Sequence, residues 1–287
     1  MNLISEMLTS ELMIRALIVA VLVGISAPIV GTYLVQRSMA LMGDGIGHIA
    51  LTGVALGWLI GAAIGIQPVD MLAVPGAIVT SMLGAALIEI FRARGRTGSD
   101  VALALLFYGG IAGGVILIRV AGGTTTNLTS YLFGSIATVS ISDVYYTVGL
   151  TLFIVAVGIG LRGPLFSLSY DPEFSRASGL RVSTLNICVA MLAALTVSIS
   201  MRVVGVLLVS AIMIVPVAIG QLVASSFRGT MAIGMTIGVI VSVAGLVITY
   251  IYPFSPGAMI VVLAVGLYMI VAALHPLIQY LSAKSHI

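Results

Sequence analysis

Long stretches without a charged residue constrain the fold of this chain more than any other feature. Six of them are uninterrupted: Ala16–Gln36, Met71–Ile88, Val101–Ile118, Val144–Leu161, Val182–Met201 and Val203–Phe227. Ile46–Val69 is broken only by His48, and Gly229–Leu274 is long enough for two helices with a turn between them. Because a helix that crosses a bilayer needs about 20 apolar residues, the pattern predicts about nine spans.

The composition agrees with a membrane protein. Only 7% of the 287 residues are charged and 60% are hydrophobic, whereas about a quarter of a soluble domain is charged. We therefore expect an all-α, polytopic transmembrane helical bundle that forms one domain over residues 1–287. The net charge of +3 lies in loops and does not form a basic face, so no nucleic-acid partner is predicted.

The loop charges predict an orientation through the positive-inside rule. With the N-terminus outside and the C-terminus in the cytoplasm, only Arg15, Arg119 and Arg202 fall on or near the outer side. The cytoplasmic set is then Arg37, Arg92, Arg94, Arg96, Arg162, Arg176, Arg181, Arg228 and Lys284. The segment Val120–Ser142 is expected to hold a short re-entrant element at most.

Smaller features add detail. Residues 1–6 lack a basic region, so no cleavable signal peptide is expected. Cys188 is the only cysteine and is interpreted as a packing residue, while Pro28, Pro75 and Pro216 are expected to interrupt spans. The glycine-rich run at residues 109–114 predicts close packing between helices.

Asp44 and His48 stand out within this apolar background. They are four residues apart and so share one face of a helix. Ionisable groups inside a membrane are costly, which makes the pair a candidate functional site. A carboxylate oxygen and an imidazole nitrogen suit Zn²⁺, Mn²⁺ or Fe²⁺ and lack the thiolate that Cu(I) prefers.

Two alternatives for this pair remain open from the spacing alone. Asp44 could cap the second span, and His48 could donate a hydrogen bond to a neighbour. Two ligands are also too few for a tight tetrahedral site. If the axis of a dimer ran beside this helix, two Asp and two His side chains could converge on one ion.

The cytoplasmic loop at residues 162–181 contains a short helix signal. Asp171 can cap it, Pro172 fits its first turn, Glu173 suits its positive end and Gly179 can end it. Phe174 would project as an apolar knob. A capped, charged helix with one exposed aromatic is suited to docking into a partner's groove, although a solvated connecting helix is the simpler alternative.

Two segments together resemble a known family. Residues 33–48, which end in Asp44-Gly45-Ile46-Gly47-His48, and residues 171–180, followed by residues 195–197 and 202–209, are similar to the permease subunits of bacterial ATP-binding-cassette (ABC) importers for zinc, manganese or iron. The resemblance extends from about Ile14 to Leu274. Thr52 stands where many relatives have proline, and Gly45 and Gly47 replace small alanine and serine residues.

The resemblance implies the fold of the vitamin B12 and siderophore-type importers. It also implies a homodimer in the bacterial plasma (inner) membrane, surrounded by membrane lipid, with two cytoplasmic ATPase subunits and an extracytoplasmic metal-binding protein. The transported ion would be zinc or manganese, with iron as a further candidate, and would contact Asp44 and His48. ATP would bind the partner subunit, and no cofactor would be held permanently. The residues expected to couple the permease to the ATPase are Pro172, Glu173, Phe174, Arg176, Ala177, Ser178 and Gly179.

Two other functions compete with this interpretation. An ion-coupled secondary transporter would usually show internal repeats and charges at the membrane midplane, and no clear repeat is visible. A membrane-embedded enzyme could use Asp44 and His48 for metal-assisted hydrolysis, but the chain lacks further ligands or an evident nucleophile. We therefore expect a transport subunit and no enzymatic activity in this chain.

Overall fold

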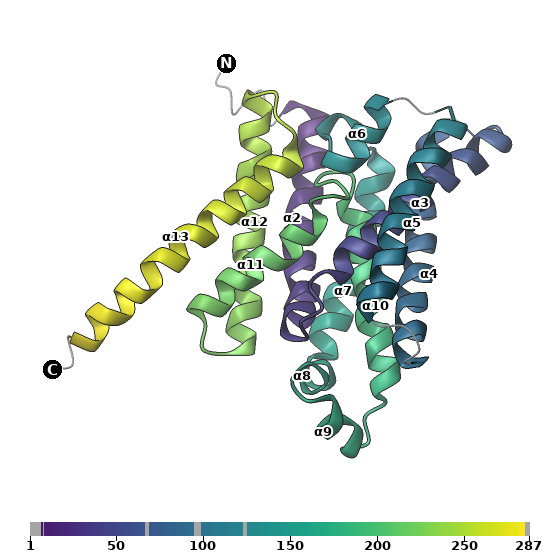
Figure 1. Ribbon diagram of the computed structural model, residues 1–287. Coiled ribbons are helices and arrows are strands. Elements are labelled where there is room, and N and C mark those ends of the chain that lie inside the picture. The colour runs from purple at the N-terminus through teal and green to yellow at the C-terminus, as the bar shows by residue number, and fades with distance from the viewer. Residues whose placement is uncertain (1–6, 8, 67–68, 95–98, 123–124, 285–287) are drawn as a thin grey trace.

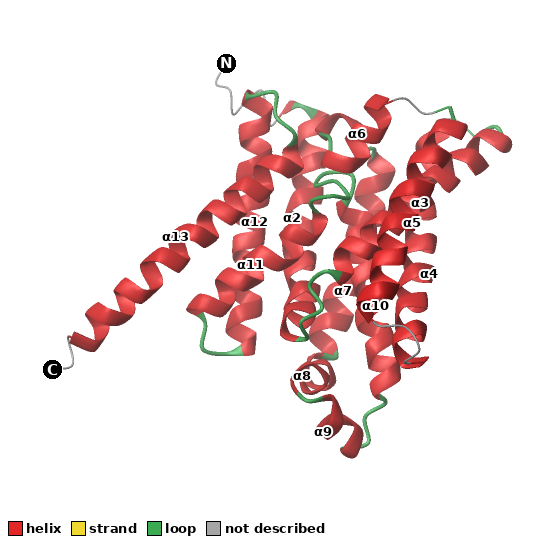
Figure 2. Ribbon diagram, in the orientation of Figure 1, coloured by secondary structure: helices red, strands yellow, loops and turns green. Residues whose placement is uncertain are grey.

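The computed structural model describes residues 7, 9–66, 69–94, 99–122 and 125–284. The expectation about a signal peptide falls on residues 1–6 and so lies outside the described residues. Within the described ranges every regular element is helical (Figures 1 and 2). The α-helices are α2 (Glu11–Gln36), α3 (Met42–Ala63), α4 (Ala73–Arg94), α5 (Ser99–Val120), α6 (Thr125–Phe133), α7 (Ile141–Gly160), α8 (Arg162–Tyr170), α9 (Pro172–Ala177), α10 (Val182–Ser200), α11 (Val209–Val223), α12 (Phe227–Ile251) and α13 (Pro256–Lys284), and two short 3-10 helices are η1 (Val69–Leu72) and η2 (Ile136–Thr138).

Eight helices in the described ranges are long and apolar enough to cross a membrane: α2, α3, α4, α5, α7, α10, α12 and α13. They confirm the all-α transmembrane bundle. The ninth expected span, Val203–Phe227, is different, because only α11 with its 15 residues is helical there. Such a helix is about 22 Å long, which is shorter than the hydrocarbon core of about 30 Å.

A buried loop, residues 201–208, replaces the missing turns before α11. Backbone without helical hydrogen bonds is tolerated in a membrane only where other protein groups satisfy it. Here the end of α6 does so: the Val206 N–H donates to the Tyr131 carbonyl over 2.9 Å, and the Ser135 N–H donates to the Arg202 carbonyl over 3.0 Å. Gly205 has φ +89°, which breaks the helix at this point.

The segment at residues 120–142 holds only short elements, as expected. α6 has nine residues and η2 has three, and neither could span a bilayer. Both lie at one end of the bundle (Figure 1). Gly134 in this segment has φ +76°. A side chain at this position would clash with the carbonyl group of Val203. The short element and the loop at residues 201–208 therefore form one packed unit.

Helix α2 lies at the centre of the bundle. It packs against α7, α10, α11 and α12. In its most apolar stretch 61% of the residues are buried inside the protein, compared with only 17% in the corresponding stretch of α13. Pro28 and Pro216 do not interrupt their helices, which corrects the expectation from sequence. Pro75 lies in the first turn of α4, where a missing N–H costs little.

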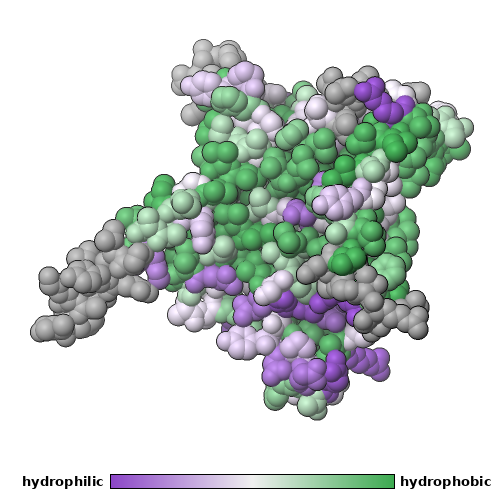
Figure 3. Space-filling view, in the orientation of Figure 1, coloured by the Kyte–Doolittle hydropathy of each residue, from purple (hydrophilic) through white to green (hydrophobic). Residues whose placement is uncertain are grey.

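The outer surface is apolar over the height of the bundle and hydrophilic at one end. In Figure 3 green surface covers the middle of the molecule, and purple residues gather at the end where α8 and α9 lie. α13 slants away from the body and exposes Val262, Met269 and Ile270. This distribution is the one expected of a protein surrounded by lipid.

Candidate functional site

Asp44 lies in the first turn of α3 and is not its cap. The helix begins at Met42, and Leu41 at the N-cap position makes no side-chain capping hydrogen bond within the described structure. The Asp44 carboxylate instead accepts a hydrogen bond from the hydroxyl of Ser210 on α11. The capping alternative is therefore wrong, because the carboxylate is directed to another helix.

His48 is buried one turn further along α3. Its side chain is 2% exposed, and its ring packs edge-on against Phe107 of α5 with the ring centroids 4.3 Å apart. Within the described residues its Nδ1 atom is buried and has no hydrogen-bond partner. A buried imidazole nitrogen without a partner is available as an acceptor for a cation.

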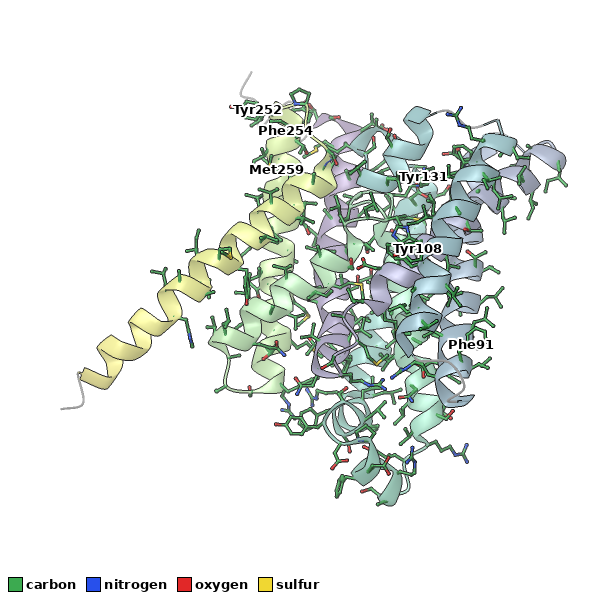
Figure 4. All side chains as sticks on the ribbon, in the orientation of Figure 1. Phe91, Tyr108, Tyr131, Tyr252, Phe254 and Met259 are labelled. Atoms are coloured by element: carbon green, nitrogen blue, oxygen red, sulfur yellow. The ribbon has the colours of Figure 1, made fainter. Side chains whose placement is uncertain are left out.

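A pocket of about 220 Å³ opens beside Asp44 between α3 and α5. Its lining residues are Leu41, Asp44, Leu103, Ala104, Phe107 and Tyr108. In Figure 4 Tyr108 lies at a level between Phe91 and Tyr131, well inside the length of the bundle. Asp44 therefore supplies the charged group of a pocket whose other lining residues are apolar or aromatic.

Close contact between α3 and α5 fixes the position of His48. A Cβ added to Gly110 would lie 2.6 Å from the carbonyl carbon of His48. The hydroxyl of Thr52 donates to the Gly110 carbonyl over 2.9 Å, which ties the two helices together one turn further on. The glycine-rich run was predicted to allow such packing, and Gly110 and Gly114 confirm it.

One protomer alone does not hold a complete metal site. Among the described residues, no group of three or more His, Cys, Asp or Glu side chains could hold a metal ion. Asp44 and His48 are thus two candidate ligands without a third among the described residues. That two copies of the chain complete a site here stays a prediction.

A network around Arg202 was missed by the sequence analysis, which placed this arginine on or near the outer side. Its side chain is buried, and the residue is only 4% exposed. Its Nη1 atom lies 3.3 Å from Asp70 Oδ2 and its Nε atom lies 3.4 Å from Asp143 Oδ2. The guanidinium also lies over the ring of Tyr131, 5.2 Å from the centroid. One signal in the sequence could have indicated this buried network: Arg202 lies on or near the outer side, where the positive-inside rule disfavours arginine.

Helix α9 is formed as its sequence predicts. Asp171 Oδ1 accepts hydrogen bonds from the backbone N–H groups of Glu173 and Phe174 over 3.0 and 2.9 Å. Gly179 follows the helix with φ +80°. The whole predicted coupling segment lies at the end of the bundle, beyond the ends of the long helices (Figure 1).

Helix α9 exposes one large apolar side chain. Phe174 is 63% exposed, whereas Arg176 and Glu173 form an ion pair with each other over 2.8 Å. The predicted knob is therefore present on a helix whose charges are mutually paired. Ala177 ends α9 and Ser178 is its C-cap residue.

The remaining candidate residues play smaller parts. Cys188 is half-buried and packs against the apolar core, which confirms its interpretation as a packing residue. His275 lies far along α13, away from the Asp44 pocket. His286 lies outside the described residues.

Comparison with known proteins places these features in a family. Residues 9–275 match the model of the ABC 3 transport family. A manganese transport system membrane protein, MntC of Halalkalibacterium halodurans, is 32% identical over 92% of this chain and 87% of its own length. A chelated iron transport system membrane protein, YfeD of Yersinia pestis, is 28% identical over 96% of this chain and 89% of its own. The solved structure of PsaBC from Streptococcus pneumoniae in complex with Fab aligns with a TM-score of 0.84 at 31% identity, covering 98% of this chain and all of the other.

Proposed function

The chain belongs to the ABC 3 transport family, and on that premise we propose that it is the membrane-spanning permease subunit of an ABC importer for a divalent transition metal. Manganese is the first candidate, since two relatives that are 32% and 34% identical to this chain are named manganese transport or import proteins. Zinc and iron are further candidates, because the same oxygen and nitrogen ligands accept all three ions. The chain is a multi-pass membrane protein and a transport subunit, with ATP hydrolysis assigned to a separate partner.

The transport site is proposed at Asp44 and His48. The single observation that carries this assignment is a buried imidazole without a partner at Nδ1, one helical turn from a carboxylate that lines a pocket. In a homodimer two copies of this pair would supply two oxygen and two nitrogen ligands. Such a site would bind the ion through few protein ligands, which suits a site that must also release its ion.

The orientation and the assembly follow from charge and from the family. With the N-terminus outside and the C-terminus in the cytoplasm, α8 and α9 lie on the cytoplasmic side of the plasma membrane. We assign two ATPase subunits to that side and an extracytoplasmic metal-binding protein to the other. The family assignment supports this arrangement over an ion-coupled secondary transporter.

Helix α9 is proposed as the element that couples the ATPase to the transport pathway. Its exposed Phe174 would insert into a groove of the ATPase subunit, and the other residues from Pro172 to Gly179 would shape the contact. ATP binding on the partner would then shift the population between conformations that open to either side. Glu173 and Arg176 would make charged contacts to the same partner.

Metal uptake into sealed vesicles tests this function. The permease and its ATPase partner are reconstituted together, and uptake of radiolabelled manganese, zinc and iron is measured with and without ATP. We expect ATP-dependent accumulation of at least one of these ions and none with the permease alone. Accumulation driven by an ion gradient in the absence of the ATPase would support the secondary transporter instead.

A further inference from the structure

A second polar pocket lies at the arginine-rich end of the bundle, away from Asp44. It has a volume of about 570 Å³ and lies between the end of α4, helix α9 and the start of α10. Its lining residues are Glu89, Ile90, Arg92, Arg176, Arg181, Val182, Ser183, Asn186 and Ile187. Three of these residues are arginines and one is an acid, so the pocket carries an excess of positive charge.

The acid in this pocket is already neutralised. Glu89 is buried and pairs with Arg92 over 2.8 Å. Arg176 pairs with Glu173 on the surface of α9. Arg181 is exposed at the N-cap position of α10 and forms no side-chain capping bond in the described structure. Its positive charge is therefore available to an anion in the pocket.

A fourth arginine adds to this charge from behind the pocket. Arg37 donates from Nη2 to Asn186 Oδ1 over 2.7 Å, and among the described residues its other terminal nitrogen, Nη1, is buried without a hydrogen-bond partner. Burial lowers the pKa of Arg37, and the nearby Arg92 guanidinium lowers it further. Arg37 is not itself a lining residue, but its positive charge adds to the potential around the pocket, which favours an anion there.

The walls of the pocket continue into the lipid-facing surface. Val79, Leu83, Leu87 and Ile90 form an exposed apolar row along α4, and this row ends at the pocket. Ile187 on α10 is exposed on the other side. A ligand with a charged group in the pocket could thus lay acyl chains along both helices. Phe174 is not among the lining residues, whereas Arg176, which we also assign to the ATPase contact, is one of them.

We propose that this pocket binds a phosphate group carried by the headgroup of an anionic phospholipid. Basic pockets between transmembrane helices on the cytoplasmic side are suited to such headgroups. The first turn of α10 presents backbone N–H groups and the positive end of the helix to the same space. The inference rests on the proposed orientation, in which this end faces the cytoplasm. The bound lipid would link the end of α4 to α9 and α10.

Lipid retention by the assembled complex tests the proposal. The permease with its ATPase partner is reconstituted in vesicles of equal parts phosphatidylglycerol and phosphatidylcholine, extracted in detergent, and its bound lipids are counted by native mass spectrometry. We expect phosphatidylglycerol to be retained over phosphatidylcholine. Arg181→Gln should lower this retention about fivefold, as expected for one basic residue at a lipid site. Arg228→Gln, an exposed arginine outside the pocket, should leave it unchanged.

Four results would overturn the assignment. Equal retention of both lipids, or no effect of Arg181→Gln at unchanged thermal stability, would exclude a headgroup site here. Retention by the isolated permease that disappears when the ATPase binds would assign the pocket to an acidic segment of that partner. Stabilisation by inorganic phosphate in phosphatidylcholine alone, without retained phosphatidylglycerol, would assign it to free phosphate. The experiment measures no metal transport, so none of these four results would contradict the proposed importer function.

Discussion

The hydroxyl of Ser210 on α11 donates a hydrogen bond to the carboxylate of Asp44 on α3, across 166 positions of sequence. This bond directs the carboxylate and occupies one of its acceptor positions. The remaining lone pairs stay available to a cation in the adjoining pocket. A second residue that orients a metal ligand in this way tunes the affinity of the site without touching the metal.

Removing this donor should weaken the site without destroying it. In Ser210→Ala the Asp44 carboxylate loses its orienting partner, and we expect about a tenfold lower apparent affinity for manganese in vesicle uptake. Ser242→Ala is the matched control, since Ser242 is equally buried and its hydroxyl has no partner among the described residues. Equal affinities for the two variants would show that the hydrogen bond does not position Asp44 for transport.

Neighbouring glycines on α5 provide a test of the contact that positions His48. Gly110→Ala places a methyl group 2.6 Å from the backbone of His48, so α3 and α5 must separate. At Gly109 no atom of the described structure lies within 4 Å of an added Cβ. We expect Gly110→Ala to lower the melting temperature and metal uptake, and Gly109→Ala to change neither, in thermal unfolding of detergent-solubilised protein and in vesicle uptake. Similar behaviour of the two variants would contradict this packing.

The buried network at Arg202 should matter for stability. Arg202→Gln leaves the buried carboxylate of Asp143 without its cation, which should cost about 3 kcal/mol and lower the melting temperature. Arg119→Gln, at an exposed arginine, should have little effect. Adding Asp143→Asn to Arg202→Gln should restore part of the loss, because the uncompensated charge is removed. A double variant no more stable than Arg202→Gln alone would argue against the ion pair.

Phe174 should be required for coupling to the ATPase. In Phe174→Ala the exposed ring that we expect to enter the partner's groove is gone, so metal-stimulated ATP hydrolysis by the complex should fall to its basal rate. Tyr170→Ala is the control, since Tyr170 is an equally exposed aromatic residue on α8 outside the coupling helix. Normal stimulation in Phe174→Ala would remove the ring from the coupling mechanism.

The charged pair on the same helix provides a separate prediction. Glu173→Ala with Arg176→Ala removes an exposed pair that contributes little to folding. If both residues contact the ATPase, the double variant should assemble less tightly and stimulate hydrolysis less. Normal assembly and stimulation would show that these charges serve only each other.

Local sequence rules were sufficient for some elements and not for others. Helix α9 was predicted because Asp171, Pro172 and Gly179 act through neighbouring backbone groups only. The loop at residues 201–208 was missed because its sequence after Arg202 is as apolar as a spanning helix. Its conformation depends on hydrogen bonds to Tyr131 and Ser135, which are remote in sequence. Hydrogen bonds to residues so far away in the chain produce no periodic pattern in the local sequence.

The same distinction applies to the candidate site. Asp44 and His48 were found because charges are rare in this chain and because the four-residue spacing is local. Ser210 and Phe107 were missed, since a serine and a phenylalanine in apolar helices carry no signal by themselves. Their contacts arise from the packing of α11 and α5 against α3. The candidate pair could thus be identified from the sequence, and the residues that contact it could not.

ATP-dependent manganese uptake by variants of Asp44 and His48 tests the central claim most directly. Asp44→Asn and His48→Ala are each reconstituted with the ATPase partner, and the intact complex is verified before uptake of the radiolabelled ion is measured. We predict uptake at background level for both variants, with the complex fully assembled. Uptake at the wild-type rate in both would contradict the assignment of this pair to the transport pathway.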